Sequence, residues 1–340
     1  MAKTALIIGG TGQIGWAAAE ALTRAGWDVT AAHRGANGPP PDLQARVVTV
    51  DRDDTAALAD AARGHDLVVD TVAFTPDHGR QLLQLDVGSL VVISTAAVYR
   101  GSNGSYLDIA TDESSFPDYP VPIDEDWPTV DNEEATYSPL KAALERVLLA
   151  GELPVSILRA GAIHGPHSPG LREWYYIKRA LDGRRRCVLA WDGAGRFHHS
   201  STFNLAALVV ACADSPGSRV LNAVDDEART DAQIAQTIFE VMEHQAEIVT
   251  FSGPPRDNVG ASPWAVAKPF VLSMAKASRE VGYQPVVSYR EAVQRDIEWA
   301  LSTLRDPRHA GQSWQEIFPG MLAFGAAGWF DYPAEDQFAG

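Results

Sequence analysis

Apolar and amphipathic stretches alternate along the first third of the chain. The apolar runs are residues 4–8, 28–32, 47–50, 67–73 and 90–94, and the amphipathic stretches include residues 14–25 and 55–62. Continuous apolar runs are typical of parallel strands covered on both faces, and the stretches between them have the period of helices. The pattern therefore predicts an α/β fold built on a doubly wound parallel sheet.

Residues 101–140 interrupt this alternation. They contain ten acidic residues, five prolines and no Lys or Arg. Proline disfavours long helices and central strands, so we expect an irregular, acidic surface segment. Apolar residues then recur at helical spacing from Thr136 to Ala150, which predicts a helix, and a further strand is expected at 155–158.

The composition narrows the class of partner. The chain has 340 residues, 46% of them hydrophobic, and a formal net charge of −16. This charge repels nucleic acids and anionic membranes, so a small-molecule substrate is the expected partner. Two cysteines are too few for a disulfide framework, and no apolar run is long enough for a signal peptide or a membrane span. We therefore predict a cytoplasmic protein.

The first predicted strand leads into a glycine-rich turn. Gly9-Gly10-Thr11-Gly12-Gln13-Ile14-Gly15 follows the strand and precedes a predicted helix. Such a turn lets the backbone approach a pyrophosphate, and the helix N-terminus offers oriented N–H groups. The sequence thus predicts a Rossmann-type NAD(P)-binding domain over residues 1–165.

The end of the second strand distinguishes NAD from NADP. An acidic side chain there binds the ribose hydroxyls of NAD, whereas Arg accommodates the additional phosphate of NADP. Here the sequence reads His33-Arg34, so NADP is preferred over NAD, with a solvent-facing Arg34 as the alternative. Asp51, after the third strand, is expected to bind the adenine amino group or to cap the next helix.

Beyond Gly165 the regular alternation gives way to glycines, tryptophans and the basic run Arg184–Arg186. We expect a smaller C-terminal α/β substrate domain, mainly residues 166–305, with some segments returning to the sheet. Its expected place is over the carboxyl ends of the strands, where ligands bind in such sheets. Residues 306–340 are rich in aromatic side chains and are predicted to pack on the body as a C-terminal extension.

Three residues suggest acid/base chemistry. Tyr137 and Lys141 are four residues apart and lie on one face of the predicted helix. An ammonium beside a phenol lowers the pKa of the phenol, so the pair can act as a general acid/base. Thr95, at the end of the fifth strand, can hydrogen-bond a substrate oxygen, although a hydroxyl there is also common in turns. Tyr-x-x-x-Lys alone also occurs by chance.

These pieces, in this order, resemble the extended short-chain dehydrogenase/reductases, also called the NAD-dependent epimerase/dehydratase family. The matching motifs are Gly9-x-x-Gly12-x-x-Gly15, Asp51, Ser94-Thr95-x-x-Val98-Tyr99, Tyr137-x-x-x-Lys141, Leu158-Arg159-x-x-x-Ile163-x-Gly165-Pro166, Asn222 and Gly282-Tyr283-x-Pro285. The resemblance implies that Thr95, Tyr137 and Lys141 are catalytic and that Lys141 also holds the nicotinamide ribose. It further implies a homodimer that pairs the Tyr137 helix and its neighbour.

Some positions depart from the family pattern. Ala96 and Ala97 stand where nucleotide-sugar dehydratases carry Asp-Glu, and Ala162 stands where nucleotide-sugar epimerases usually have Asn. Arg100 stands where a Gly is usual after Tyr99. Ala96 and Ala97 disfavour dehydration, and Ala162 weakens the case for a nucleotide-sugar substrate.

Histidines and arginines of the second half are further candidates. His164, His167 and His198-His199 lack the spacing of a metal motif, so no metal is predicted. His164 occupies a position that is usually Tyr in the family, which makes it an expected substrate contact. Arg184–Arg186 and Arg196 either clamp a phosphate or form a solvated basic face.

Together these features predict an NAD(P)-dependent oxidoreductase or epimerase that moves a hydride to or from a hydroxyl- or carbonyl-bearing carbon of a small polar or sugar-like substrate. The alternatives are a nucleotide-sugar epimerase with recycled NAD and a catalytically silent NADP-sensing or scaffold protein. The predicted cofactor-binding residues are Gly9, Thr11, Gly12, Gln13, Ile14, Gly15, His33, Arg34, Asp51, Arg52, Ala73, Phe74, Tyr137, Lys141 and Ala160. The predicted substrate contacts are Thr95, Ala96, Tyr137, His164 and Arg196.

Overall fold

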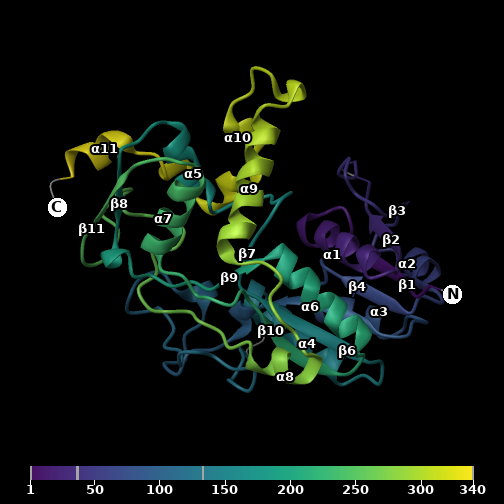
Figure 1. Cartoon of the computed structure of the whole chain (residues 1–340). Coiled ribbons are helices and arrows are strands. Elements are labelled where there is room, and N and C mark those ends of the chain that lie inside the picture. Colours follow the sequence, from purple (N-terminus) through teal and green to yellow (C-terminus); the bar gives the residue numbers. More distant parts are fainter. Residues whose placement is uncertain (1, 36–37, 132–133, 339–340) are drawn as a thin grey trace.

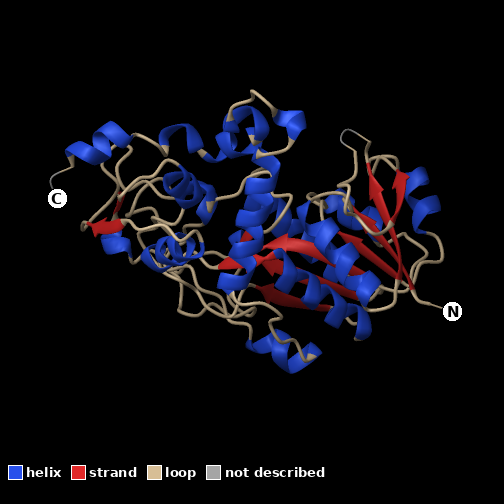
Figure 2. Ribbon diagram, turned by 45° about the horizontal axis from the view of Figure 1, so that its top comes forward, coloured by secondary structure: helices blue, strands red, loops and turns tan. Residues whose placement is uncertain are grey.

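A seven-stranded parallel sheet forms the centre of the molecule, in the order β10-β6-β5-β4-β1-β2-β3 (Figures 1 and 2). The structure is a computed structural model that describes residues 2–35, 38–131 and 134–338, so residues 132–133 of the acidic segment lie outside it. The strands are β1 (Thr4–Ile8), β2 (Asp28–His33), β3 (Arg46–Thr49), β4 (Leu67–Asp70), β5 (Leu90–Thr95), β6 (Val155–Ala160) and β10 (Arg219–Ala223). The strand order reverses between β1 and β4, which is where such sheets bind ligands.

Helices cover both faces of this sheet. One face carries α1 (Gln13–Arg24), α6 (Thr202–Asp214) and α8 (Ala275–Val281), and the other carries α2 (Thr55–Ala62), α3 (Pro76–Leu82) and α4 (Tyr137–Leu149). Successive β1 residues face opposite layers, since Ile7 packs with Leu22 of α1 while Leu6 packs with Leu144 of α4. The expected doubly wound Rossmann-type sheet is confirmed.

A second core lies away from the sheet and contains aromatic side chains from distant segments. It is built from α5 (Trp174–Leu181), α7 (Asp231–Val241), α9 (Tyr289–Leu304), α10 (Trp314–Ile317) and the strand pair β8 (Arg186–Leu189) and β11 (Glu247–Thr250). The C-terminal segment, which ends in α11 (Tyr332–Gln337), places Met321 and Trp329 in this core, at the end of the molecule opposite the N-terminus (Figure 1). The division into domains at residues 165 and 305 stays a prediction.

The short strands β7 (Ala162–His164) and β9 (His199–Ser201) form a separate parallel pair next to the end of β6.

The described part of the acidic segment is irregular apart from a short helical turn at Leu107–Ile109, but it does not lie wholly on the surface. Ile123 is fully buried and bridges to Leu272, which ties the segment to the body of the protein. None of the helices in the described ranges is long and apolar enough to span a membrane.

Candidate active site

The glycine turn closes tightly at the end of β1. Gly9 adopts a φ of 77°, and its carbonyl accepts a hydrogen bond from the N–H of Gly12 at 3.0 Å. A Cβ on Gly15 would lie 2.3 Å from the Gly9 oxygen, so only glycine permits this approach of helix and turn. The first N–H groups of α1 remain available to an anion, which is the arrangement that binds a pyrophosphate.

A cavity of about 400 Å³ opens beside this turn. Its lining includes the predicted residues Gly9, Thr11, Gly12, His33, Arg34 and Arg52. Asp53, rather than Asp51, lies on its wall, while the Asp51 carboxylate accepts the N–H of Asp53 and Asp54 caps α2. Size, glycine lining and the adjacent helix N-terminus fit the adenosine half of a dinucleotide.

Asp70 and His78, which the sequence did not indicate, support this cavity together with Arg52. The buried guanidinium of Arg52 donates to Asp70 at 2.5 Å, and Asp70 accepts the N–H groups of Val72 and Ala73. His78 also lines the cavity, and its Nδ1 accepts the N–H of Phe74 at 3.0 Å. The loop after β4 is thus fixed by side chains from three different elements.

A second cavity, of about 430 Å³, lies at the carboxyl ends of β5 and β6. The predicted residues on its wall are Gln13, Thr95, Ala96, Tyr137 and Ala160. Gln13 belongs to the glycine turn and donates to the carbonyl of Gly165 at 3.3 Å, so the two cavities adjoin at the turn. The wall also includes Arg172, Phe197 and Phe270, none of which the sequence indicated.

Tyr137 and Thr95 lie together on the wall of this cavity, and the Thr95 side chain acts on the phenol of Tyr137. Thr95 also accepts the N–H of Ala97 at 3.2 Å, and Phe74 stacks on the Tyr137 ring with centroids 5.7 Å apart. Partial burial of the phenol raises the pKa of Tyr137, although the residue is still 47% exposed and Thr95 acts in the opposite direction. The expected lowering of this pKa by Lys141 is therefore wrong for this arrangement.

Lys141 is more deeply buried than Tyr137, and its ammonium already donates hydrogen bonds to the backbone. Its Nζ donates to the carbonyls of Ala73 at 2.6 Å and Ile93 at 2.9 Å. Burial lowers the pKa of Lys141 to about 8, against the opposing charges of Asp70 and Glu145. Lys141 connects the loop after β4 with β5, which explains why the phenol does not benefit from its charge here.

Comparison with known proteins identifies the family. The model of the NAD dependent epimerase/dehydratase family matches residues 5–223. The chain belongs to this family. A search of curated proteins found no match.

Solved structures of epimerase/dehydratase type share the fold at low identity. MoeE5 in complex with UDP-glucose and NAD is 20% identical, with a TM-score of 0.65 over 88% of this chain and 99% of that one. The dTDP-glucose 4,6-dehydratase of Bacillus anthracis, in complex with NAD, is 17% identical, with a TM-score of 0.67 over 89% and 98%. UDP-N-acetylglucosamine 4-epimerase from Bacillus cereus is 15% identical, with a TM-score of 0.66 over 87% and 99%.

The motif residues of the epimerase/dehydratase family that lie behind the reaction cavity form a buried polar network. Arg159 pairs with Glu145 at 2.7 Å, and its guanidinium lies 4.7 Å from the centre of the Tyr99 ring. Tyr99 donates to Asn222 at 2.7 Å. These residues fix β5, β6 and β10 relative to α4, and so position Thr95 and Tyr137 without touching a ligand.

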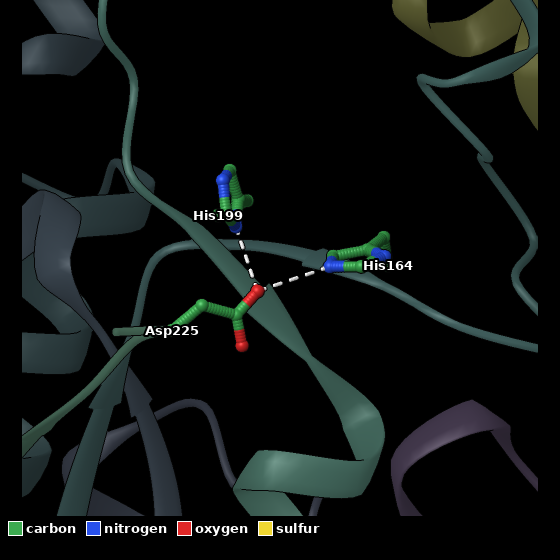
Figure 3. A group of neighbouring side chains, drawn as sticks. All are labelled: His164, His199 and Asp225. Carbon is green, nitrogen blue, oxygen red and sulfur yellow. Dashed lines mark hydrogen bonds and ion pairs between the residues drawn. The ribbon is translucent and has the colours of Figure 1, made fainter. Parts of the chain in front are cut away.

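His164 does not line the reaction cavity, contrary to the prediction of a substrate contact. It is 1% exposed and lies between two carboxylates, 2.7 Å from Asp296 and 3.2 Å from Asp225 (Figure 3). From β7, which pairs with β9, its ring reaches Asp296 of α9. Arg196 is exposed and outside the described wall of the cavity, where its neighbour Phe197 takes the predicted place.

His164, His199 and Asp225 approach one another closely enough to suggest a metal group (Figure 3). Hydrogen bonding accounts for their arrangement, because both rings point a nitrogen at the same Asp225 oxygen, that of His199 at 2.6 Å. The other Asp225 oxygen accepts from Ser201 and Asn204. Although burial acts to lower it, Asp296 and Asp225 raise the pKa of His164 well above its ordinary value, so the imidazolium already supplies the cation.

Replacing this cation tests the structural role of the cluster. His164→Asn removes the cation that lies between the buried carboxylates of Asp296 and Asp225, so we expect the free energy of unfolding to fall by about 3 kcal/mol. Because the folded pKa of His164 is raised, its contribution is present below about pH 6.5 and is lost as pH rises through that folded pKa. Urea unfolding at several pH values measures this. His309→Asn, at an exposed histidine, is the control, and equal stability of H164N and the wild type would contradict the role.

Proposed function

We propose that the protein is an NAD(P)-dependent oxidoreductase that moves a hydride between the nicotinamide and a carbon bearing a hydroxyl or carbonyl. The observation that carries the proposal is that Tyr137 and Thr95 line one cavity together with Gln13 of the glycine turn. The bound cofactor supplies or accepts the hydride. A phenol and a second hydroxyl aimed at one oxygen are what the proton half of that reaction needs.

Each residue then has a separate task. The raised pKa keeps Tyr137 protonated at neutral pH, so its phenol donates a proton to the substrate oxygen when a carbonyl is reduced. Thr95 hydrogen-bonds the same oxygen and holds it in place. Lys141, whose ammonium is fixed between the β4 loop and β5, is the residue that would hold the ribose of the cofactor.

Absorbance of the reduced nicotinamide during a substrate screen tests this function. A reductase consumes the reduced cofactor in proportion to product, and we expect such a decrease with carbonyl substrates. The second candidate is a nucleotide-sugar epimerase with recycled NAD, which the fold shared with UDP-N-acetylglucosamine 4-epimerase supports. A flat trace together with a changed product would favour that candidate. Cofactor binding without any turnover would instead favour a silent sensor or scaffold.

We propose NADP as the preferred cofactor, although similar solved structures hold NAD. Arg34 and His33 line the adenosine cavity at the end of β2, where the additional phosphate of NADP is bound. Arg34→Asp should weaken NADPH binding by about tenfold to a hundredfold, because a charged hydrogen-bond donor is replaced by a repelling carboxylate. Fluorescence titration with NADPH and NADH measures the change in the ratio of the two affinities.

Arg63→Asp is the matched control for this prediction. Arg63 is exposed and pairs with Asp60 of α2, outside the described lining of the cofactor cavity. Its replacement changes the net charge by the same amount and should leave the NADPH to NADH ratio unaltered. A wild-type protein that prefers NADH, or an R34D variant with an unchanged ratio, would contradict the preference for NADP.

We also propose that the protein acts in the cytoplasm as a homodimer in which α3 and α4 of two copies pair. The adjacency of α3 and α4 and the exposed Leu149 at the end of α4 support this surface. Light scattering that gives the mass of a single chain would exclude the dimer.

A further inference from the structure

The wall of the reaction cavity is apolar apart from a few side chains. Its apolar members are Ala96, Ala97, Ala160, Ala162, Ile163, Pro169, Phe197 and Phe270. The Phe197 and Phe270 rings lie 5.0 Å apart and form a continuous aromatic patch. Among the described residues on this wall, the charged side chain is Arg172. The cavity therefore offers one guanidinium on an otherwise largely neutral surface.

Arg172 is held in place by its neighbours along the chain. Leu171 and Glu173, on either side of it, are fully buried, and α5 begins at Trp174. The preceding loop is closed by a hydrogen bond from the N–H of Gly170 to the Ser168 hydroxyl at 3.3 Å. A guanidinium on such a fixed backbone is preorganised for a ligand that enters the cavity.

The C-terminal segment packs against the loop that precedes Arg172. Gly320 lies so close to the carbonyl of Pro169 that a Cβ would come within 2.0 Å of its oxygen. Trp314 and Phe318 pack on Trp174, with ring centroids 5.9 Å and 5.5 Å away. Residues far apart in the sequence thus determine where Arg172 enters the cavity.

The charge of Arg172 acts on the reacting centre. Its guanidinium lowers the pKa of Tyr137, and Tyr137 in turn is among the groups that act on Arg172. Burial lowers the pKa of Arg172, yet a guanidinium stays protonated at neutral pH. The charge of the adjacent Glu173 opposes this lowering of the Arg172 pKa.

We propose that Arg172 binds a carboxylate of the substrate, which makes the substrate a small hydroxy or oxo acid with an apolar body. This inference rests on the proposed function, because it places the carboxylate beside the carbon whose oxygen Tyr137 and Thr95 hold. The planar fork of Arg matches the two oxygens of a carboxylate. Phe197 and Phe270 offer the apolar surface for the rest of the molecule.

Two of the arginines expected to clamp a phosphate, Arg184 and Arg186, have partners elsewhere. Arg184 pairs with Asp336, and Arg186 donates to the carbonyl of Phe338 at 2.9 Å. Both contacts are made with the C-terminal segment. One guanidinium on the cavity wall suits one carboxylate better than the two charges of a nucleotide diphosphate.

Two matched probes test the charge preference directly. Phenylacetate and phenylacetamide have the same shape, but only the first is an anion. Titration calorimetry on the NADPH-loaded protein should show phenylacetate binding at least about tenfold more tightly. Arg172→Leu should abolish the difference, whereas Arg196→Leu, at an exposed arginine outside the described cavity wall, should retain it.

Each other outcome has a defined meaning. Equal binding of the two probes by the wild type overturns the proposal without reliance on any variant, as does an R172L variant that keeps the preference while folded. Tighter binding of UDP that depends on Arg172 would show a nucleotide site instead. Because binding needs no turnover, a preference that persists in Tyr137→Phe supports the carboxylate site even if the hydride-transfer function fails.

Discussion

Tyr137→Phe is expected to lose turnover by about 10²- to 10⁴-fold, because it removes the general acid of the reaction and leaves the ring in place. The Phe ring can still stack on Phe74, so the wall of the cavity and the start of α4 should be preserved. Cofactor affinity should change little, since the cofactor contacts proposed for the glycine turn remain. Steady-state kinetics and NADPH titration on the same preparation measure both quantities.

Tyr332→Phe is the control for this variant. Tyr332 donates its hydroxyl to Asp182 at an exposed site in the C-terminal segment, so its loss should leave turnover unaltered. A Y137F enzyme with wild-type turnover would remove Tyr137 from the mechanism. A Y137F protein that no longer binds NADPH would show that the phenol serves binding rather than proton transfer.

Gly15→Ala is expected to weaken binding of the cofactor. The new Cβ would lie 2.3 Å from the Gly9 oxygen and 2.6 Å from the Gly10 Cα, so α1 or the turn must move. The displacement disturbs the N–H groups proposed to bind the pyrophosphate, and overpacking of this kind costs about 1–3 kcal/mol. We expect NADPH affinity to fall by about tenfold to a hundredfold.

Gly38→Ala is the control for Gly15→Ala, because it adds the same methyl group at a site where there is room for it. Gly38 has open space where a Cβ would be placed, and its φ is not positive. NADPH titration and thermal unfolding should therefore give wild-type values for G38A. If G15A bound NADPH as tightly as the wild type, the glycine turn could not be the pyrophosphate site.

Much of the fold follows from local sequence patterns. The apolar runs give most strands of the central sheet within a few residues, and the helix expected at 136–150 is α4, Tyr137–Leu149. Helix α3 was not expected, although Thr75 caps it and Pro76 occupies its first position, a local signal of a helix start. Local periodicity reports burial on both faces, but it does not report which strand lies beside which.

The sequence predicts those parts of the candidate site whose residues are close together along the chain. The glycine turn and Thr95 occur at strand ends, where spacing along the chain is also spacing in the fold. Phe197 and Phe270 come together through a bridge between segments 73 residues apart, and no sequence pattern indicates that contact. His164 was misassigned because the pairing of β7 with β9, which buries its ring, is equally non-local.

The raised pKa of Tyr137 shows a second limit of prediction from residue spacing. Tyr137 and Lys141 lie one turn apart, yet the ammonium bonds to carbonyls of Ala73 and Ile93. Those carbonyls belong to the loop after β4 and to β5, so the partner of Lys141 depends on how α4 packs on the sheet. The shared helix face brings Tyr137 and Lys141 close together, but it does not determine the effect of the ammonium on the pKa of the phenol.

The position of the nicotinamide ring in a crystal of the protein with NADPH tests the central claim most directly. The account predicts phosphates at the N-terminus of α1 and the ring in the cavity lined by Thr95 and Tyr137, within hydrogen-bonding reach of a substrate oxygen held by both hydroxyls. A ring bound outside that cavity, with Tyr137 facing no part of it, would contradict the account.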